Sequence, residues 1–143
     1  MFVYDRATQT DRQLTTSPSQ KYSEFWSPDG RWVAFSANTD GTVQVWRISA
    51  AGGSGAKEEQ LTTSVERFIH FFYSPDGRWL YVQPSHHNIQ RMPAAGGGPK
   101  PVTHFSEHGL FLEEPTISPD GRWLVYNRGK GGSSLWLLTI GKP

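Results

Sequence analysis

The sequence Ser-Pro-Asp-Gly-Arg-Trp occurs three times in this chain of 143 residues. The copies occupy residues 27–32, 74–79 and 118–123, so their starts lie 47 and 44 residues apart. Shorter sequences follow the same spacing: Gln-Leu-Thr at 13–15 and 60–62, Pro-Val-Thr at 101–103, and Ala-Ala-Gly-Gly at 50–53 and 94–97. A repeat of this length predicts a chain built from several copies of one supersecondary unit.

The repeated sequence is suited to a tight turn. Proline presets φ for the first corner, aspartate accepts hydrogen bonds from backbone amides two residues on, and glycine supplies a positive φ. The isolated aspartates have few other metal-ligating neighbours, which favours a turn over a calcium loop. We therefore assign a structural turn role to Asp29, Gly30, Asp76, Gly77, Asp120 and Gly121.

Four short strands are predicted in each unit. The first strands precede the turns, at 22–26, 68–73 and 113–117, and the second strands follow them, at 31–35, 78–82 and 122–126. Third strands are expected at 43–49, 88–93 and 134–140, and fourth strands around 60–62 and 101–103. The second strands are apolar enough to be covered on both faces. No segment has a sustained helical period, so the pattern predicts an all-β fold of four-stranded β-propeller blades with almost no helix.

The chain divides into a blade remnant at 1–16, blades at 17–64 and 65–105, and a blade lacking its last strand at 106–143. Closed propellers have about four to eight blades, and an apolar blade face does not stay exposed to water. We expect the ring to close in one of two ways. Either two copies form a homo-oligomer of about six blades, with an N-terminal strand of one completing the last blade of the other, or the chain is part of a longer one.

The Ser-Pro-Asp-Gly-Arg-Trp turns, the aromatic strands before them and the Leu-Thr of the fourth strand resemble the TolB-type, WD40-like β-propeller family. The resemblance implies a platform for interaction or gating, with contacts at the loops around a central channel, in a periplasmic or other extracytoplasmic location. The same blade type precedes prolyl-oligopeptidase-type hydrolase domains and forms oligogalacturonate lyases. Fold alone does not choose among these functions.

Composition and hydropathy exclude several kinds of partner, site and membrane segment. The net charge of +1 is unlike that of a nucleic-acid-binding protein, and the absence of Cys excludes disulfides and thiolate metal sites. No apolar run approaches the ~18 residues of a membrane-spanning helix. Residues 1–6 have neither a basic region nor an apolar run, so we expect no secretory signal in this chain.

No catalytic residues and no cofactor are expected. The sequence Gly-Gly-Ser-Gly-Ala at 52–56 lacks the last glycine of a nucleophile elbow, and the glycine-rich stretches lack the Lys-Ser/Thr of a phosphate loop. The five histidines are His70, His86, His87, His104 and His108. The resemblance to oligogalacturonate lyases implies a metal held by His and Gln, and Gln83 and Gln90 lie nearby, but no spacing joins them into one site. We therefore predict no metal site.

The first strand is innermost in a propeller blade, so its start should lie at the mouth of the central channel. The polar residues there are Ser23, Glu24, His70, Glu113 and Glu114. A partly acidic mouth suits a cation, a basic peptide or only water. The sequence thus predicts a non-catalytic module that binds a protein or peptide of unknown identity. The alternative is the substrate-gating propeller of a prolyl-oligopeptidase-like peptidase or of an oligogalacturonate-lyase-like metal-dependent enzyme.

Overall fold

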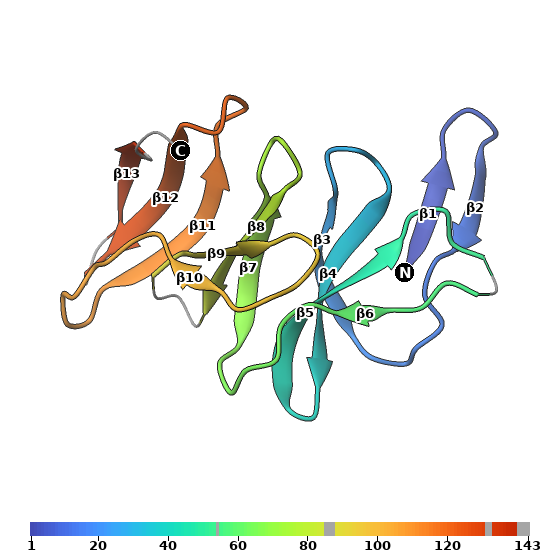
Figure 1. Ribbon diagram of the computed structural model, residues 1–143, viewed down its shortest axis with the longest axis horizontal. Coiled ribbons are helices and arrows are strands. Elements are labelled where there is room, and N and C mark those ends of the chain that lie inside the picture. The colour runs from blue at the N-terminus through green and yellow to red at the C-terminus, as the bar shows by residue number, and fades with distance from the viewer. Residues whose placement is uncertain (54, 85–87, 131–132, 140–143) are drawn as a thin grey trace.

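The computed structural model describes residues 1–53, 55–84, 88–130 and 133–139 (Figure 1). Within these residues the chain forms thirteen strands and no helix, which confirms the all-β prediction. The strands make a two-stranded hairpin, two four-stranded sheets and a three-stranded sheet, all antiparallel. The sheets follow one another across the molecule in chain order and form an open arc rather than a closed ring (Figure 1).

The strand bounds define four units. The N-terminal hairpin consists of β1 (Phe2–Asp5) and β2 (Thr10–Gln13). Blade 1 consists of β3 (Lys21–Trp26), β4 (Trp32–Thr39), β5 (Thr42–Ser49) and β6 (Glu59–Gln60). Blade 2 consists of β7 (Phe68–Tyr73), β8 (Trp79–Pro84), β9 (Gln90–Pro93) and β10 (Lys100–Pro101). Blade 3 consists of β11 (Phe111–Ile117), β12 (Trp123–Gly129) and β13 (Ser133–Thr139).

The repeated turn joins the first and second strands of every blade. In blade 1 the Ser27 hydroxyl donates to Asp29 Oδ1 at 2.6 Å and accepts from the Trp32 amide at 3.0 Å. The Gly30 amide donates to the Ser27 carbonyl at 2.9 Å, and φ is +70° at this glycine. The turns of blades 2 and 3 repeat these bonds with nearly the same distances. The local sequence alone therefore specifies the turn.

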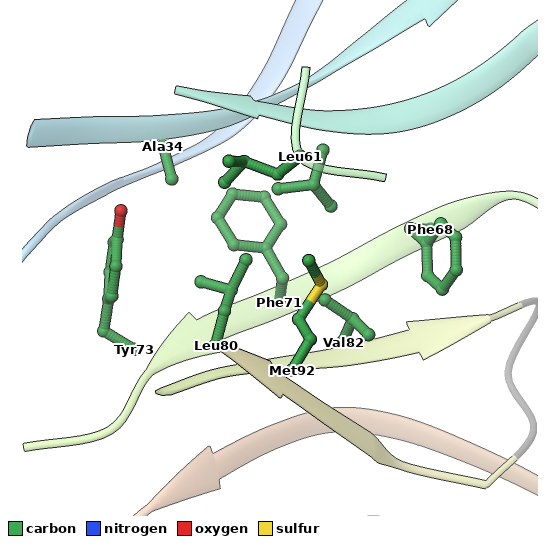
Figure 2. Packing of buried hydrophobic residues seen from close by; sticks show 9 residues of the cluster. Ala34, Leu61, Phe68, Phe71, Tyr73, Leu80, Val82 and Met92 are labelled. Carbon is green, nitrogen blue, oxygen red and sulfur yellow. The ribbon is translucent and has the colours of Figure 1, made fainter. Parts of the chain in front are cut away.

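Alternate residues of the second strands β4 and β8 face opposite neighbours, so the core lies between sheets. The cluster between blades 1 and 2 contains Phe71, Leu80 and Val82 of blade 2 against Ala34 and Val45 of blade 1 (Figure 2). The next cluster joins blade 2 to blade 3, and a third joins the hairpin to blade 1. Blade 2 is thus covered on both faces, as its apolar second strand predicts.

Each first strand contains a β-bulge that breaks its register with the second strand. The bulge lies between Tyr22 and Phe25 in β3 and between Glu113 and Thr116 in β11. In β7 it lies earlier, before His70, which pairs directly with Gln83. A bulge adds a residue and changes which face the following side chains occupy. The polar positions of the three first strands are therefore not fully equivalent.

Candidate functional site

The inner edges of the three blades meet along the first strands. β7 contacts β3 on one side and β11 on the other, so the three edge strands lie next to one another. All five polar residues expected at a channel mouth lie on these strands, at or beside the bulges. Ser23 and Glu114 have φ of 55° and 49°. This left-handed backbone is unfavourable for residues other than glycine by about 1–2 kcal/mol, and such strain collects at functional surfaces.

These side chains differ in exposure and in partners. Ser23, His70 and Glu113 are half-buried, whereas Glu24 and Glu114 are exposed. The carboxylates of Glu24, Glu113 and Glu114 make no side-chain hydrogen bond or ion pair within the described part of the chain. An acidic surface without internal counter-ions is available to a cationic ligand.

Two neighbouring cations already have carboxylate partners. Lys21 at the start of β3 lies 3.6 Å from Glu58, and Arg128 of β12 pairs with Glu107. The charges of these two residues are therefore directed to other carboxylates than Glu24, Glu113 and Glu114.

Glu24 does not share its surroundings with the other four residues. It lines a hollow of about 440 Å³ between the N-terminal hairpin and blade 1. Trp26, Phe2 and Tyr4 line the same hollow and are 53%, 62% and 60% exposed. These aromatics are not among the site residues predicted from the sequence. One feature of the sequence could have predicted their exposure. The N-terminal hairpin corresponds to the third and fourth strands of a blade, so it brings no first or second strand to cover blade 1.

A model of the TolB beta propeller domain matches residues 1–141. This chain belongs to that family. The structural comparison agrees: TolB from Acinetobacter baumannii has a TM-score of 0.77 and 21% identity, over 97% of this chain and 35% of that one. A protein assigned as TolB from Agrobacterium tumefaciens has a TM-score of 0.72 and 24% identity, over 91% and 49%.

Enzymes with the same fold are also similar to this TolB-type chain. Oligogalacturonate lyase from Vibrio parahaemolyticus has a TM-score of 0.67 and 16% identity, over 90% of this chain and 35% of the lyase. At such identities the likeness shows the fold alone. The chain spans about half or about a third of the length of these proteins.

The TolB-type blades bring no metal-ligand cluster together among the residues that the structure describes. His70 is half-buried on β7, while His104 and His108 are exposed in the loop between blades 2 and 3. His86 and His87 lie outside the described residues. No helix in the described chain is long and apolar enough to cross a membrane.

The carboxylates of the repeated turn have lowered pKa values, and their hydrogen-bond partners belong to the same turn. The Ser27 hydroxyl, the Arg31 amide and the Arg31 guanidinium lower the pKa of Asp29 to about 2. Asp76 has the same partners in blade 2, and its pKa is also lowered to about 2. Arg31 and Arg78 each lie 2.6 Å from the aspartate of their own turn. Such engagement serves the turn itself rather than a bound metal.

The tryptophans of the repeat lie at the rim of the core. Trp32, Trp79 and Trp123 are half-buried rather than fully enclosed. The guanidinium carbon of Arg47 lies 4.0 Å from the Trp32 ring centroid, and that of Arg91 lies 4.2 Å from the Trp79 ring centroid. In these two blades an arginine covers the outer face of the ring by a cation–π contact.

Proposed function

We propose that this TolB-type chain is a non-catalytic module that binds a protein or peptide at the inner edges of its blades. The observation that carries the proposal is the set of carboxylates on β3 and β11 that have no internal counter-ions. Two of the three, Glu24 and Glu114, are exposed. Left-handed backbone at Ser23 and Glu114 supports a functional surface, because strained positions are retained where they serve binding.

The chemistry of the inner edge favours a basic ligand. Three carboxylates on β3 and β11 attract lysine and arginine side chains, although the whole chain carries a net charge of only +1. Exposed ion pairs contribute about 0.2–1 kcal/mol each, so useful affinity needs several of them together. A lysine-rich peptide segment meets that requirement.

Fluorescence anisotropy with a labelled peptide of alternating lysine and glycine tests this proposal. The triple variant Glu24→Gln/Glu113→Gln/Glu114→Gln should bind about tenfold more weakly than the unchanged chain, from three lost ion pairs. The control Asp11→Asn/Asp40→Asn/Glu66→Gln removes the same charge from exposed positions elsewhere. Equal weakening by both triple variants would mean that only net charge matters, and the proposed site would be wrong.

As the alternative in which Glu24 is not open to a basic peptide, we propose that a second copy of this chain covers the hollow beside the hairpin. At the junction of blades 1 and 2, Phe25 packs edge-on against Phe71, with ring centroids 5.4 Å apart. Glu24 of blade 1 is equivalent in position to Phe71 of blade 2. Thr116 of blade 3 is equivalent in position to Phe25 of blade 1. Both are exposed, and a threonine hydroxyl can donate to a carboxylate. Blade 3 of one copy therefore complements blade 1 of another.

Light scattering tests this pairing. A homo-dimer has about twice the chain mass of 16.1 kDa. Trp26→Glu should give monomers, whereas Val65→Glu, at a residue that is 97% exposed, should leave the dimer intact. A monomeric unchanged chain at high concentration would overturn the pairing and favour further blades from a longer polypeptide.

The competing proposal makes this chain the propeller of a peptidase or a lyase. It is supported by the likeness in fold to oligogalacturonate lyase. Metal analysis of the purified chain separates the lyase from the binding module: stoichiometric manganese or zinc would favour the lyase, and its absence would count against it.

A further inference from the structure

The outer halves of blades 1 and 2 have the same architecture but different charges. In blade 1, Arg47 on β5 stands directly opposite Glu59 on β6 in the strand register. Arg47 Nη2 lies 2.7 Å from Glu59 Oε2, and its guanidinium group covers Trp32. The pair places opposite charges across neighbouring strands, which is the stabilising arrangement.

Blade 2 keeps the arginine and the tryptophan but replaces the carboxylate by a cation. Arg91 on β9 covers Trp79 as Arg47 covers Trp32. The residue directly opposite Arg91 is Lys100 on β10. Like charges in this position are unfavourable. Within the part of the chain that the structure describes, neither side chain has a carboxylate partner.

These two cations line a hollow of about 330 Å³ on the outer side of blade 2. Trp79, Pro93 and Pro101 give it apolar walls. Arg91 and Lys100 are exposed, so their donors are open to solvent. The hollow therefore combines a guanidinium fork and an ammonium group with a surface that suits a small apolar body.

We propose that this hollow binds a carboxylate attached to a small apolar body, such as the acidic side chain of a peptide. The bound carboxylate occupies the place that Glu59 holds in blade 1 and neutralises the two facing cations. The apolar body rests against Trp79 and the prolines. The site lies at the outer strands of blade 2, apart from the acidic inner edge. A negative result for the basic ligand proposed above would therefore not count against this site.

Nuclear magnetic resonance of the ¹⁵N-labelled full chain tests the site, with sodium benzoate as the probe at constant ionic strength. The Trp79 indole N–H signal should shift saturably, with a Kd on the order of 1–10 mM for a ligand of this size. Benzyl alcohol, which lacks the charge, should cause no saturable shift. Saturation by the alcohol at the same concentration would overturn the assignment of an anion site. Inorganic phosphate that bound as tightly as benzoate would overturn the need for an apolar body.

Blade 1 supplies the matched control. Lys100→Glu recreates the Arg47–Glu59 arrangement in blade 2 and should weaken benzoate binding at least tenfold. Glu59→Lys should create a second benzoate site, reported by the Trp32 indole signal. Lys130→Glu makes the same charge change at an exposed residue of blade 3 and should leave the Kd unchanged. A shift at Trp79 that stayed the same in Lys100→Glu would refute the proposal.

Discussion

The junction between blades 1 and 2 is closed, whereas the junction between the hairpin and blade 1 is half open. Phe71 and Tyr73 of β7 are 2% and 8% exposed in the first junction. At the equivalent positions of β3, Glu24 is exposed and Trp26 is 53% exposed. The hairpin supplies counterparts of a third and a fourth strand only, and these cover Phe35 and Ile48 but not Trp26. The comparison shows that a blade forms by its own turns, while its burial depends on what the neighbour brings.

The largest contrast should come from the two equivalent inner positions. Phe71→Ala removes a fully buried ring from the core in Figure 2 and should lower the free energy of unfolding by about 3–5 kcal/mol. Glu24→Ala at the open junction should change it by less than about 0.5 kcal/mol. Urea denaturation of both variants as monomers measures the difference. Similar losses at the two positions would mean that the hairpin itself closes this junction in the monomer.

Loss of the serine hydroxyl from the repeated turn should lower the free energy of unfolding equally in blades 1 and 2. Ser74→Ala removes a hydroxyl that accepts from the Trp79 amide at 3.0 Å and donates to Asp76 at 2.6 Å. The loss should be about 1–2 kcal/mol, and Ser27→Ala should cost nearly the same. The measurement is again urea denaturation. A difference above about 1 kcal/mol between the two variants would contradict a turn specified by local sequence alone.

Tyr73 has an unsatisfied polar group within the closed junction between blades 1 and 2. Its hydroxyl is buried without a hydrogen-bond partner among the described residues, and burial raises its pKa to about 12. Tyr73→Phe removes the unsatisfied group and keeps the ring, so it should be neutral or stabilise the fold by up to about 1 kcal/mol. A thermal melt that showed clear destabilisation would reveal a partner for this hydroxyl in solution.

The smallest expected effect is the dependence of folding stability on pH, and it should be the same for the turns of blades 1 and 2. The pKa values of Asp29 and Asp76 are about 2 in the folded chain, against an ordinary value of 3.8. A depressed folded pKa adds stability above the ordinary value, and this stability is lost as pH falls from about 4 to about 2. Carboxyl titration by nuclear magnetic resonance checks both residues. A value near 3.8 for either would show that its turn is not formed as described.

The sequence was sufficient for the repeating architecture because its signals are local. The Ser-Pro-Asp-Gly-Arg-Trp turns and the apolar runs beside them predicted the first three strands of both four-stranded sheets. Observed strands differ mainly in length: the second strand of blade 1 was predicted at 31–35 and extends over Trp32–Thr39. The fourth strands, Glu59–Gln60 and Lys100–Pro101, are only two residues long and carried little pattern of their own.

The surroundings of the candidate site depend on three-dimensional detail that the sequence does not display. The bulge in β7 lies earlier than the bulges in β3 and β11, so His70 is not in the same position as Ser23 and Glu114. Glu24 lines a hollow beside the hairpin because that neighbour lacks two strands. The place of a bulge does not follow from the spacing of the repeat, whereas the incomplete blade at residues 1–16 did predict missing cover.

The sharing of every core cluster between adjacent sheets has a consequence for unfolding. Each of the three clusters draws its buried residues from two consecutive units of the chain. Stability in such an array approximates a sum over nearest neighbours, so losing a terminal unit removes one interface while the rest persists. Amide exchange should then progress inward from the hairpin, and the amides of β8, enclosed on both sides, should be among the last to exchange.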